Sequence, residues 1–134
     1  MIVAVCIDDN GGMLFNKRRQ SRDKAVLEDL KNQGKKVWIH SFSEKLFSEY
    51  TGMVVVDDDF LKKAGEGDIC FVENQSLKPY ESQMEQIIVY KWNRKYPGDF
   101  RLDLDIHHWK LIEQVEFAGN SHEKITREVY SGRV

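Results

Sequence analysis

The sequence predicts a single α/β domain: a three-layer sandwich with a mostly parallel central sheet and an antiparallel C-terminal hairpin. Two observations predict this fold class. Through residues 1–73, short apolar runs alternate with helical patterns, which is typical of parallel strands joined by right-handed crossovers. From residue 84 onward, turns too short to hold a helix separate the β-rich runs. Neighbouring strands in that part are therefore expected to run antiparallel.

The first strand and the first helix follow directly from the residue pattern. A strand is predicted over residues 1–8, of which the first seven form a continuous apolar run, as expected of a strand that is buried on both faces. Residues 21–33 show helical periodicity, with Ser21 as the predicted N-cap and Gly34 as the stop. The apolar face of this helix consists of Val26, Leu27 and Leu30.

Shorter elements continue the alternation of strand and helix up to residue 73. Strands are predicted over residues 36–40, 53–56 and 68–72, and helices over residues 43–50 and 60–64. In the C-terminal part, residues 87–90 predict a strand and Tyr96–Asp99 predict a turn. Residues 109–117 and 125–130 then predict a hairpin, with a turn at residues 118–121.

Size and charge limit the classes of partner. A chain of 134 residues buries roughly two thirds of its unfolded surface, which is enough for one core over residues 1–134. The net charge of −2 gives no electrostatic attraction to nucleic acid or to an anionic membrane. We therefore expect neither as a partner.

The chain shows no sign of export or membrane insertion. It opens on an apolar strand without the basic start of a signal peptide, and no apolar run approaches the roughly 20 residues of a membrane helix. Cys6 and Cys70 lie within apolar runs, as buried thiols of a reduced protein do. These features predict a cytoplasmic protein.

Polar residues gather at the carboxyl ends of the predicted parallel strands, where open α/β sheets bind ligands. They are Asp8, Asp9, His40, Ser41, Asp57, Asp58, Asp59, Glu73 and Asn74. We interpret most of the acids as solvated loop residues or helix caps, because loops are usually solvated and acids favour helix N-termini. None of the four histidines shows zinc-like spacing. No metal site is predicted. The basic residues 17–22 precede the first helix and could hold a phosphate or carboxylate, although a solvated loop is the simpler interpretation.

Several runs, in order, resemble one known family. They are Ile2–Gly11, residues 34–39, Tyr96–Phe100, residues 105–112 and residues 123–133. Their order and spacing are similar to those of dihydrofolate reductase, over nearly the whole chain. The resemblance implies that family's fold, in a shortened and divergent form. If the chain is an enzyme, it implies a related oxidoreductase.

The resemblance also implies where the pterin cleft lies. The family has one pocket acid on its first helix, which orients the pterin and helps to protonate it. Asp23 matches this acid and is the predicted catalytic residue, although a one-residue shift of the alignment places Lys24 there instead. The predicted ligand pocket consists of Ala4, Met13, Leu27, His40, Ser43 and Asn74.

The cofactor positions depart from the family pattern. In the run of residues 40–43, Ser43 keeps a hydroxyl, but the arginine that would meet a phosphate is absent. Asp57–Asp59 would repel the 2′-phosphate of NADP. Glu73 and Asn74 replace the paired glycines that let the backbone approach the pyrophosphate. The sequence therefore predicts an eroded NADPH site and leaves the cofactor unknown.

Three functions remain compatible with the sequence. The favoured one is a domain that no longer catalyses the parent reaction and binds another small ligand in the former pterin cleft. The second is an NAD(P)H-dependent reductase with an altered substrate or cofactor. The third is a protein-interaction or assembly module, which an exposed patch around Phe42, Phe47 and Tyr50 would support. The ligand and the oligomeric state stay open.

Overall fold

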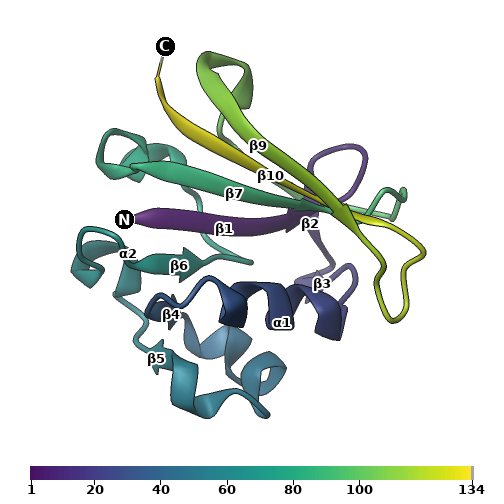
Figure 1. Cartoon of the computed structure of the whole chain (residues 1–134), viewed down its shortest axis with the longest axis horizontal. Coiled ribbons are helices and arrows are strands. Elements are labelled where there is room, and N and C mark those ends of the chain that lie inside the picture. The colour runs from purple at the N-terminus through teal and green to yellow at the C-terminus, as the bar shows by residue number, and fades with distance from the viewer. Residues whose placement is uncertain (134) are drawn as a thin grey trace.

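A seven-stranded sheet forms the centre of the computed structural model, which describes residues 1–133 (Figure 1). The strand order is β5-β4-β6-β1-β7-β10-β9. These strands are β1 (Ile2–Ile7), β4 (Val37–Ile39), β5 (Val54–Val56), β6 (Ile69–Phe71), β7 (Gln86–Lys91), β9 (Trp109–Phe117) and β10 (Ile125–Arg133). Five of them run parallel, β10 is antiparallel to β7, and β9 is antiparallel to β10. The predicted fold class is confirmed.

Short helices connect and cover these strands. They are the α-helices α1 (Lys24–Asn32) and α2 (Phe60–Lys63), and the 3₁₀ helices η1 (Ser41–Phe47), η2 (Thr51–Met53), η3 (Lys78–Gln83) and η4 (Ile106–His108). No helix within residues 1–133 is long and apolar enough to cross a membrane.

The central strand β1 shows why both faces of the sheet are covered. Alternate side chains of a strand point to opposite faces. Ile2 and Ala4 join a core with residues of α1 and η1, whereas Val3 and Val5 join a second core with residues of α2. All four are at most 3% exposed, as expected of a strand read as a continuous apolar run.

Two helix predictions need correction. The N-cap of α1 is Asp23 rather than Ser21, because the Asp23 side chain accepts a hydrogen bond from the Ala25 amide at 2.9 Å. The segment predicted as an α-helix over residues 43–50 is instead the 3₁₀ helix η1. Its first and last turns close through i→i+3 bonds, such as the Ser43 amide to the His40 carbonyl at 2.9 Å. A run of this length cannot distinguish the two helix types by periodicity.

A second, small sheet was not predicted from the sequence. Its order is β3-β2-β8, formed by β2 (Gly12–Phe15), β3 (Arg18–Arg19) and β8 (Phe100–Arg101). Asn16 and Lys17 join β2 to β3 with φ of 52° and 63°, the conformation of the tight hairpin turn that matches strand twist. This hairpin turns the basic segment into an ordered element that carries Arg19 toward β6.

The predicted C-terminal hairpin is confirmed as β9 and β10. Its connecting loop lies beside the start of α1 (Figure 1). The loop amides of Asn120 and Ser121 each donate to the Asp23 carboxylate at 2.9 Å. The start of α1 is thus joined to the loop of the C-terminal hairpin.

Candidate functional site

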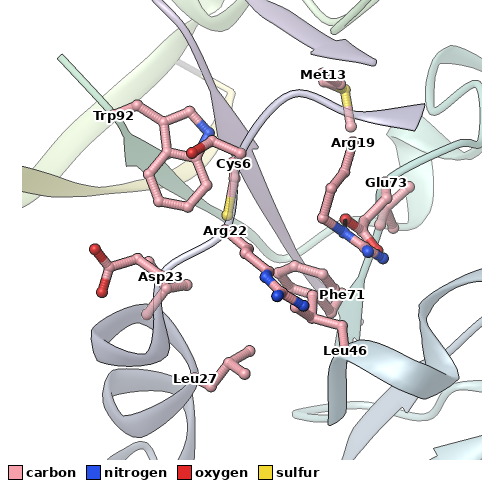
Figure 2. Close-up of a pocket in the computed structure, with 13 residues that line it drawn as sticks. Cys6, Met13, Arg19, Arg22, Asp23, Leu27, Leu46, Phe71, Glu73 and Trp92 are labelled. Atoms are coloured by element: carbon pink, nitrogen blue, oxygen red, sulfur yellow. Dashed lines mark hydrogen bonds and ion pairs between the residues drawn. The ribbon is translucent and has the colours of Figure 1, made fainter. Parts of the chain in front are cut away.

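A small cavity lies between α1, β1, β6 and the β2–β3 hairpin, at the carboxyl ends of the parallel strands (Figure 2). Its volume is about 20 Å³, which is room for one or two water molecules. It is lined by Cys6, Met13, Arg19, Ser21, Arg22, Asp23, Val26, Leu27, Leu46, Phe71, Val72, Glu73 and Trp92. Apolar side chains form most of the wall, and Asp23 lies across the cavity from Arg19 and Glu73 (Figure 2).

An ion pair between Arg19 and Glu73 lies at the carboxyl end of β6. Arg19 donates from Nε and Nη2 to the two carboxylate oxygens of Glu73, both at 2.7 Å. The hydroxyl of Ser43 donates to Glu73 Oε1 at 2.7 Å, and the Arg19 guanidinium lies 5.5 Å from the centre of the Phe42 ring. Glu73 is 9% exposed. Such a bidentate, hydrogen-bonded pair fixes both side chains in place.

Asp23 is bound on all sides by the β9–β10 loop and by its own helix. Besides the Ala25, Asn120 and Ser121 amides, its carboxylate accepts from the His122 amide at 3.1 Å and the Ser121 hydroxyl at 3.2 Å. Burial alone would raise the pKa of Asp23, but these hydrogen bonds and that of the His122 ring hold the pKa well below its usual range. In Figure 2 the carboxylate turns away from Phe71 and Glu73.

The low pKa bears on the predicted role of Asp23. A carboxylate that stays ionised accepts hydrogen bonds but has no proton to give. The geometry therefore favours an orienting role over proton donation. That Asp23 acts on a ligand at all stays a prediction.

The ring of His122 lies between Asp23 and the loop that precedes α1. Its Nδ1 is 2.9 Å from Asp23 Oδ2, and its Nε2 is 2.9 Å from Ser21 Oγ. The Tyr96 hydroxyl is 3.0 Å from the same Nε2. Trp92 stacks on the imidazole with 4.5 Å between ring centres and 20° between planes. His122 is 4% exposed, so the ring is held by contacts on its edges and on a face.

A wider groove adjoins the cavity between α1 and η1. Its volume is about 380 Å³, and it shares Arg22, Asp23, Leu27 and Leu46 with the cavity. Arg22, Lys24 and Lys45 line it, together with Glu49, which pairs with Lys24 at 3.2 Å. Within residues 1–132 neither Arg22 nor Lys45 has a carboxylate within ion-pair distance of its side chain. The lining therefore combines three cations and two carboxylates with the apolar side chains of Leu27 and Leu46.

The residues predicted for the ligand pocket divide into two sets. Met13 and Leu27 line the cavity, as Asp23 does. The other four lie around it without lining it: fully buried Ala4, Ser43 on Glu73, His40 with its Nδ1 2.9 Å from the Phe42 amide, and Asn74. The Asn74 side-chain oxygen is buried without a hydrogen-bond partner among the residues described.

Burial disfavours the thiolate form of both cysteines. Burial raises the pKa of Cys6 well above its usual value, and burial raises the pKa of Cys70 to about 12. Both thiols stay protonated near neutral pH, and a thiol is a far weaker nucleophile than a thiolate. Across the described part of the chain, no group of three or more His, Cys, Asp or Glu side chains is arranged to hold a metal ion.

Sequence reasoning missed Arg19, Ser21, Tyr96, Trp92 and His122 as residues of the site. Ser21 was assigned to a helix cap and His122 to no role. The turn-prone run 118–121 was the available signal, because its side chains and amides meet the start of α1 only after the hairpin forms.

Comparison with known proteins decides the fold. No family model matches this chain, and no curated protein matches its sequence. Its structure is similar to that of dihydrofolate reductase from Enterococcus faecalis, complexed with NADP(H) and RAB-propyl, with a TM-score of 0.67. The match covers 98% of this chain and 95% of that one, at 12% sequence identity. The chain has the dihydrofolate reductase fold.

Within this dihydrofolate reductase fold, the cavity and the groove both lie along α1. The resemblance drawn from the sequence is confirmed at the level of the fold. At 12% identity the likeness does not extend to activity, because one fold supports many functions.

Proposed function

We propose that this domain binds a small organic anion in the groove between α1 and η1, and that it does not catalyse NADPH-dependent reduction. The observation that carries the proposal is the Arg19–Glu73–Ser43 network at the end of β6. It occupies the position where the family resemblance expects paired glycines, and it leaves the adjoining groove as the open space.

The network works against a dinucleotide in two ways. Side chains at Glu73 and Asn74 keep a pyrophosphate from approaching the backbone. Removing Arg19 from Glu73 to make a phosphate contact would leave a buried carboxylate unpaired, which is costly. Asp57 and Asp58, at the end of β5, add negative charge where the resemblance expects the 2′-phosphate.

The groove supports an anionic ligand. Arg22 and Lys45 have no ion-pair partner within residues 1–132, so their charges are free to meet a carboxylate. Leu27 and Leu46 supply apolar surface for the rest of the ligand. A cleft with an apolar base and a few convergent polar groups is the usual form of a small-molecule site.

Two probes that differ only in charge test this proposal. Naphthalene-2-carboxylate and 2-naphthamide share the same ring, and saturation-transfer NMR compares their binding. We expect the carboxylate to bind more tightly than the amide. The double substitution Arg22→Ala, Lys45→Ala should weaken carboxylate binding at least about tenfold, since each hydrogen bond to a charged group contributes ~1.5–3 kcal/mol.

The matched control is Lys95→Ala, which removes an exposed lysine outside the groove and should leave binding unchanged. Equal binding of the two probes would contradict an anion site. Retention of carboxylate binding in the double variant would contradict the groove as its location.

Of the three residues named for an interaction patch, Phe42 is half-buried and the other two are buried. Phe47 and Tyr50 are 0% and 9% exposed, and both belong to the core on the α1 side of the sheet. The large apolar side chains that are exposed lie elsewhere, at Phe15, Val56, Leu111, Ile112 and Val115.

A further inference from the structure

Ser21, His122 and Asp23 form a continuous hydrogen-bonded series at the edge of the cavity. Ser21 Oγ is 2.9 Å from His122 Nε2, and His122 Nδ1 is 2.9 Å from Asp23 Oδ2. We propose that these residues act as nucleophile, general base and positioning residue, and that they hydrolyse small carboxylic esters. Nucleophile, base and orienter within hydrogen-bond reach are the geometric requirements for acyl transfer.

The partners of Asp23 fix the tautomer of His122. A carboxylate that accepts backbone amides is an acceptor only, so the imidazole Nδ1 carries the proton toward it. The lone pair of the neutral ring is then on Nε2, on the side of Ser21. This is the tautomer that a general base needs to take the serine proton.

Packing holds the base in that orientation. The side chains of His122 and Asp23 are 2% and 0% exposed, and Trp92 stacks on the imidazole. Ser21 is only half-buried and lines the cavity. The nucleophile is thus the member of the series that an ester can reach.

Two further polar groups touch the series. The Tyr96 hydroxyl is 3.0 Å from His122 Nε2 and 3.4 Å from Ser21 Oγ, and the Ser121 hydroxyl is 3.3 Å from Nδ1. Only one hydroxyl donates to the Nε2 lone pair at a time. When Tyr96 donates to Ser21 Oγ, the serine proton points at His122, and the three groups form one chain.

Arg22 supplies the positive charge for the transition state. It follows Ser21 in the chain and extends across the pocket toward Phe71 and Leu46 (Figure 2). Within residues 1–132 its guanidinium has no ion-pair partner. A guanidinium without a carboxylate partner, on a side chain that lines the same pocket as Ser21, can stabilise the negative charge that develops on the carbonyl oxygen.

The two spaces define the class of ester. The cavity beside Ser21, at about 20 Å³, accepts no more than a short acyl group such as acetyl. The alcohol part would lie in the larger groove, beside Lys45. This division rests on the proposed function for the placement of the alcohol, but the reaction at Ser21 does not depend on anion binding.

The reaction balances with water as the second reactant. Ser21 Oγ bonds to the carbonyl carbon, and its proton passes to His122 Nε2. The bond from carbon to the alcohol oxygen breaks, and that oxygen takes the proton from His122. Water then attacks the acyl-serine with the same proton transfers, which releases the acid and restores Ser21.

Covalent labelling of the intact protein tests the proposal. Methanesulfonyl fluoride is small and reacts with activated serines, with loss of fluoride. We expect one sulfonyl group per chain, and we expect peptide mass spectrometry to place it on Ser21. p-Nitrophenyl acetate, assayed in parallel, should be hydrolysed, and labelling should stop the hydrolysis.

Variants separate catalysis from a structural role. Ser21→Ala should abolish labelling and hydrolysis, and His122→Gln should slow both about a hundredfold, the usual contribution of a general base. Asp23→Asn keeps a side-chain N-cap acceptor and should lower kcat with little change in KM. Tyr96→Phe should retain labelling, and Ser82→Ala, which removes an exposed serine of η3, should label like the wild type.

Locating the sulfonyl group on the wild-type protein tests the proposal even if the variants fail to fold. No adduct, or an adduct at another residue, would overturn the proposal, as would labelling of Ser21 at the same rate in a folded His122→Gln variant. If labelling failed while the groove still bound the carboxylate, ester hydrolysis would be contradicted and the proposed anion binding would not.

Discussion

At the scale of single residues, Asp23 connects distant parts of the chain. Its carboxylate caps α1 and binds loop groups 97 to 99 positions later in the sequence. The sequence pattern placed an acid near the start of a helix, which is a local feature. It could not supply the partners, because they arrive only with the β9–β10 hairpin.

The pKa of Asp23 predicts how this residue contributes to stability with pH. Hydrogen bonds hold its pKa in the folded protein well below the unfolded value of about 3.9. A lowered pKa contributes stability that is complete above the unfolded value and is lost as the pH falls toward the folded one. Asp23→Asn should therefore lower the free energy of unfolding at pH 7 by about 2 kcal/mol, and by less at pH 3.

Urea denaturation at the two pH values measures this difference. Asp9→Asn is the control, since the exposed Asp9 side chain makes no hydrogen bond among the described residues, and it should change stability little at either pH. A deficit for Asp23→Asn that is as large at pH 3 as at pH 7 would contradict the assignment.

At the scale of elements, the β2–β3 hairpin determines the character of the site. Its turn at Asn16 and Lys17 brings Arg19 to the end of β6, 54 residues away in sequence. The basic segment was interpreted as a solvated loop, because strands of two to four residues leave no periodic pattern. Because of this hairpin, the Arg19 guanidinium lines the cavity instead of lying in a solvated loop.

The Arg19–Glu73 pair predicts an asymmetric cost of substitution. Arg19→Ala leaves the nearly buried Glu73 without its cation and should cost about 2–3 kcal/mol of unfolding free energy. Arg19→Ala combined with Glu73→Gln should recover part of that loss, since the amide carries no charge. Urea denaturation of the wild type, both single variants and the double variant gives the coupling energy.

Lys63→Ala provides the matched control. It breaks the exposed Lys63–Asp57 pair, which also joins its atoms at 2.7 Å, and should cost under about 1 kcal/mol. If Arg19→Ala were no more destabilising than Lys63→Ala, the cavity pair would not hold the end of β6 as described.

At the scale of the whole molecule, the large sheet could be predicted and the small one could not. Buried runs such as that of β1, and the hairpin of β9 and β10, are visible in local patterns of apolar residues and turns. The sheet β3-β2-β8 joins segments more than 80 residues apart, as in the pairing of Gly12 with Arg101. No local pattern reveals such a pairing.

The candidate site divides in the same way. Leu27 could be found from helical periodicity, and Met13 and Asp23 from the family resemblance, and all three line the cavity. Arg19 and His122 escaped prediction because each is defined by a partner far along the chain. Glu73 could be recognised in the sequence as a departure from the family pattern, but its pairing with Arg19 could not.

We propose that this chain, with its dihydrofolate reductase fold, does not bind a dinucleotide. Titration of the protein with NADPH, followed by the fluorescence of the nicotinamide, tests it most directly. The dihydrofolate reductase of Enterococcus faecalis, whose structure holds NADP(H), serves as the positive control. We expect no saturable change for this chain at NADPH concentrations that saturate the control. Saturable binding in the micromolar range would contradict the claim.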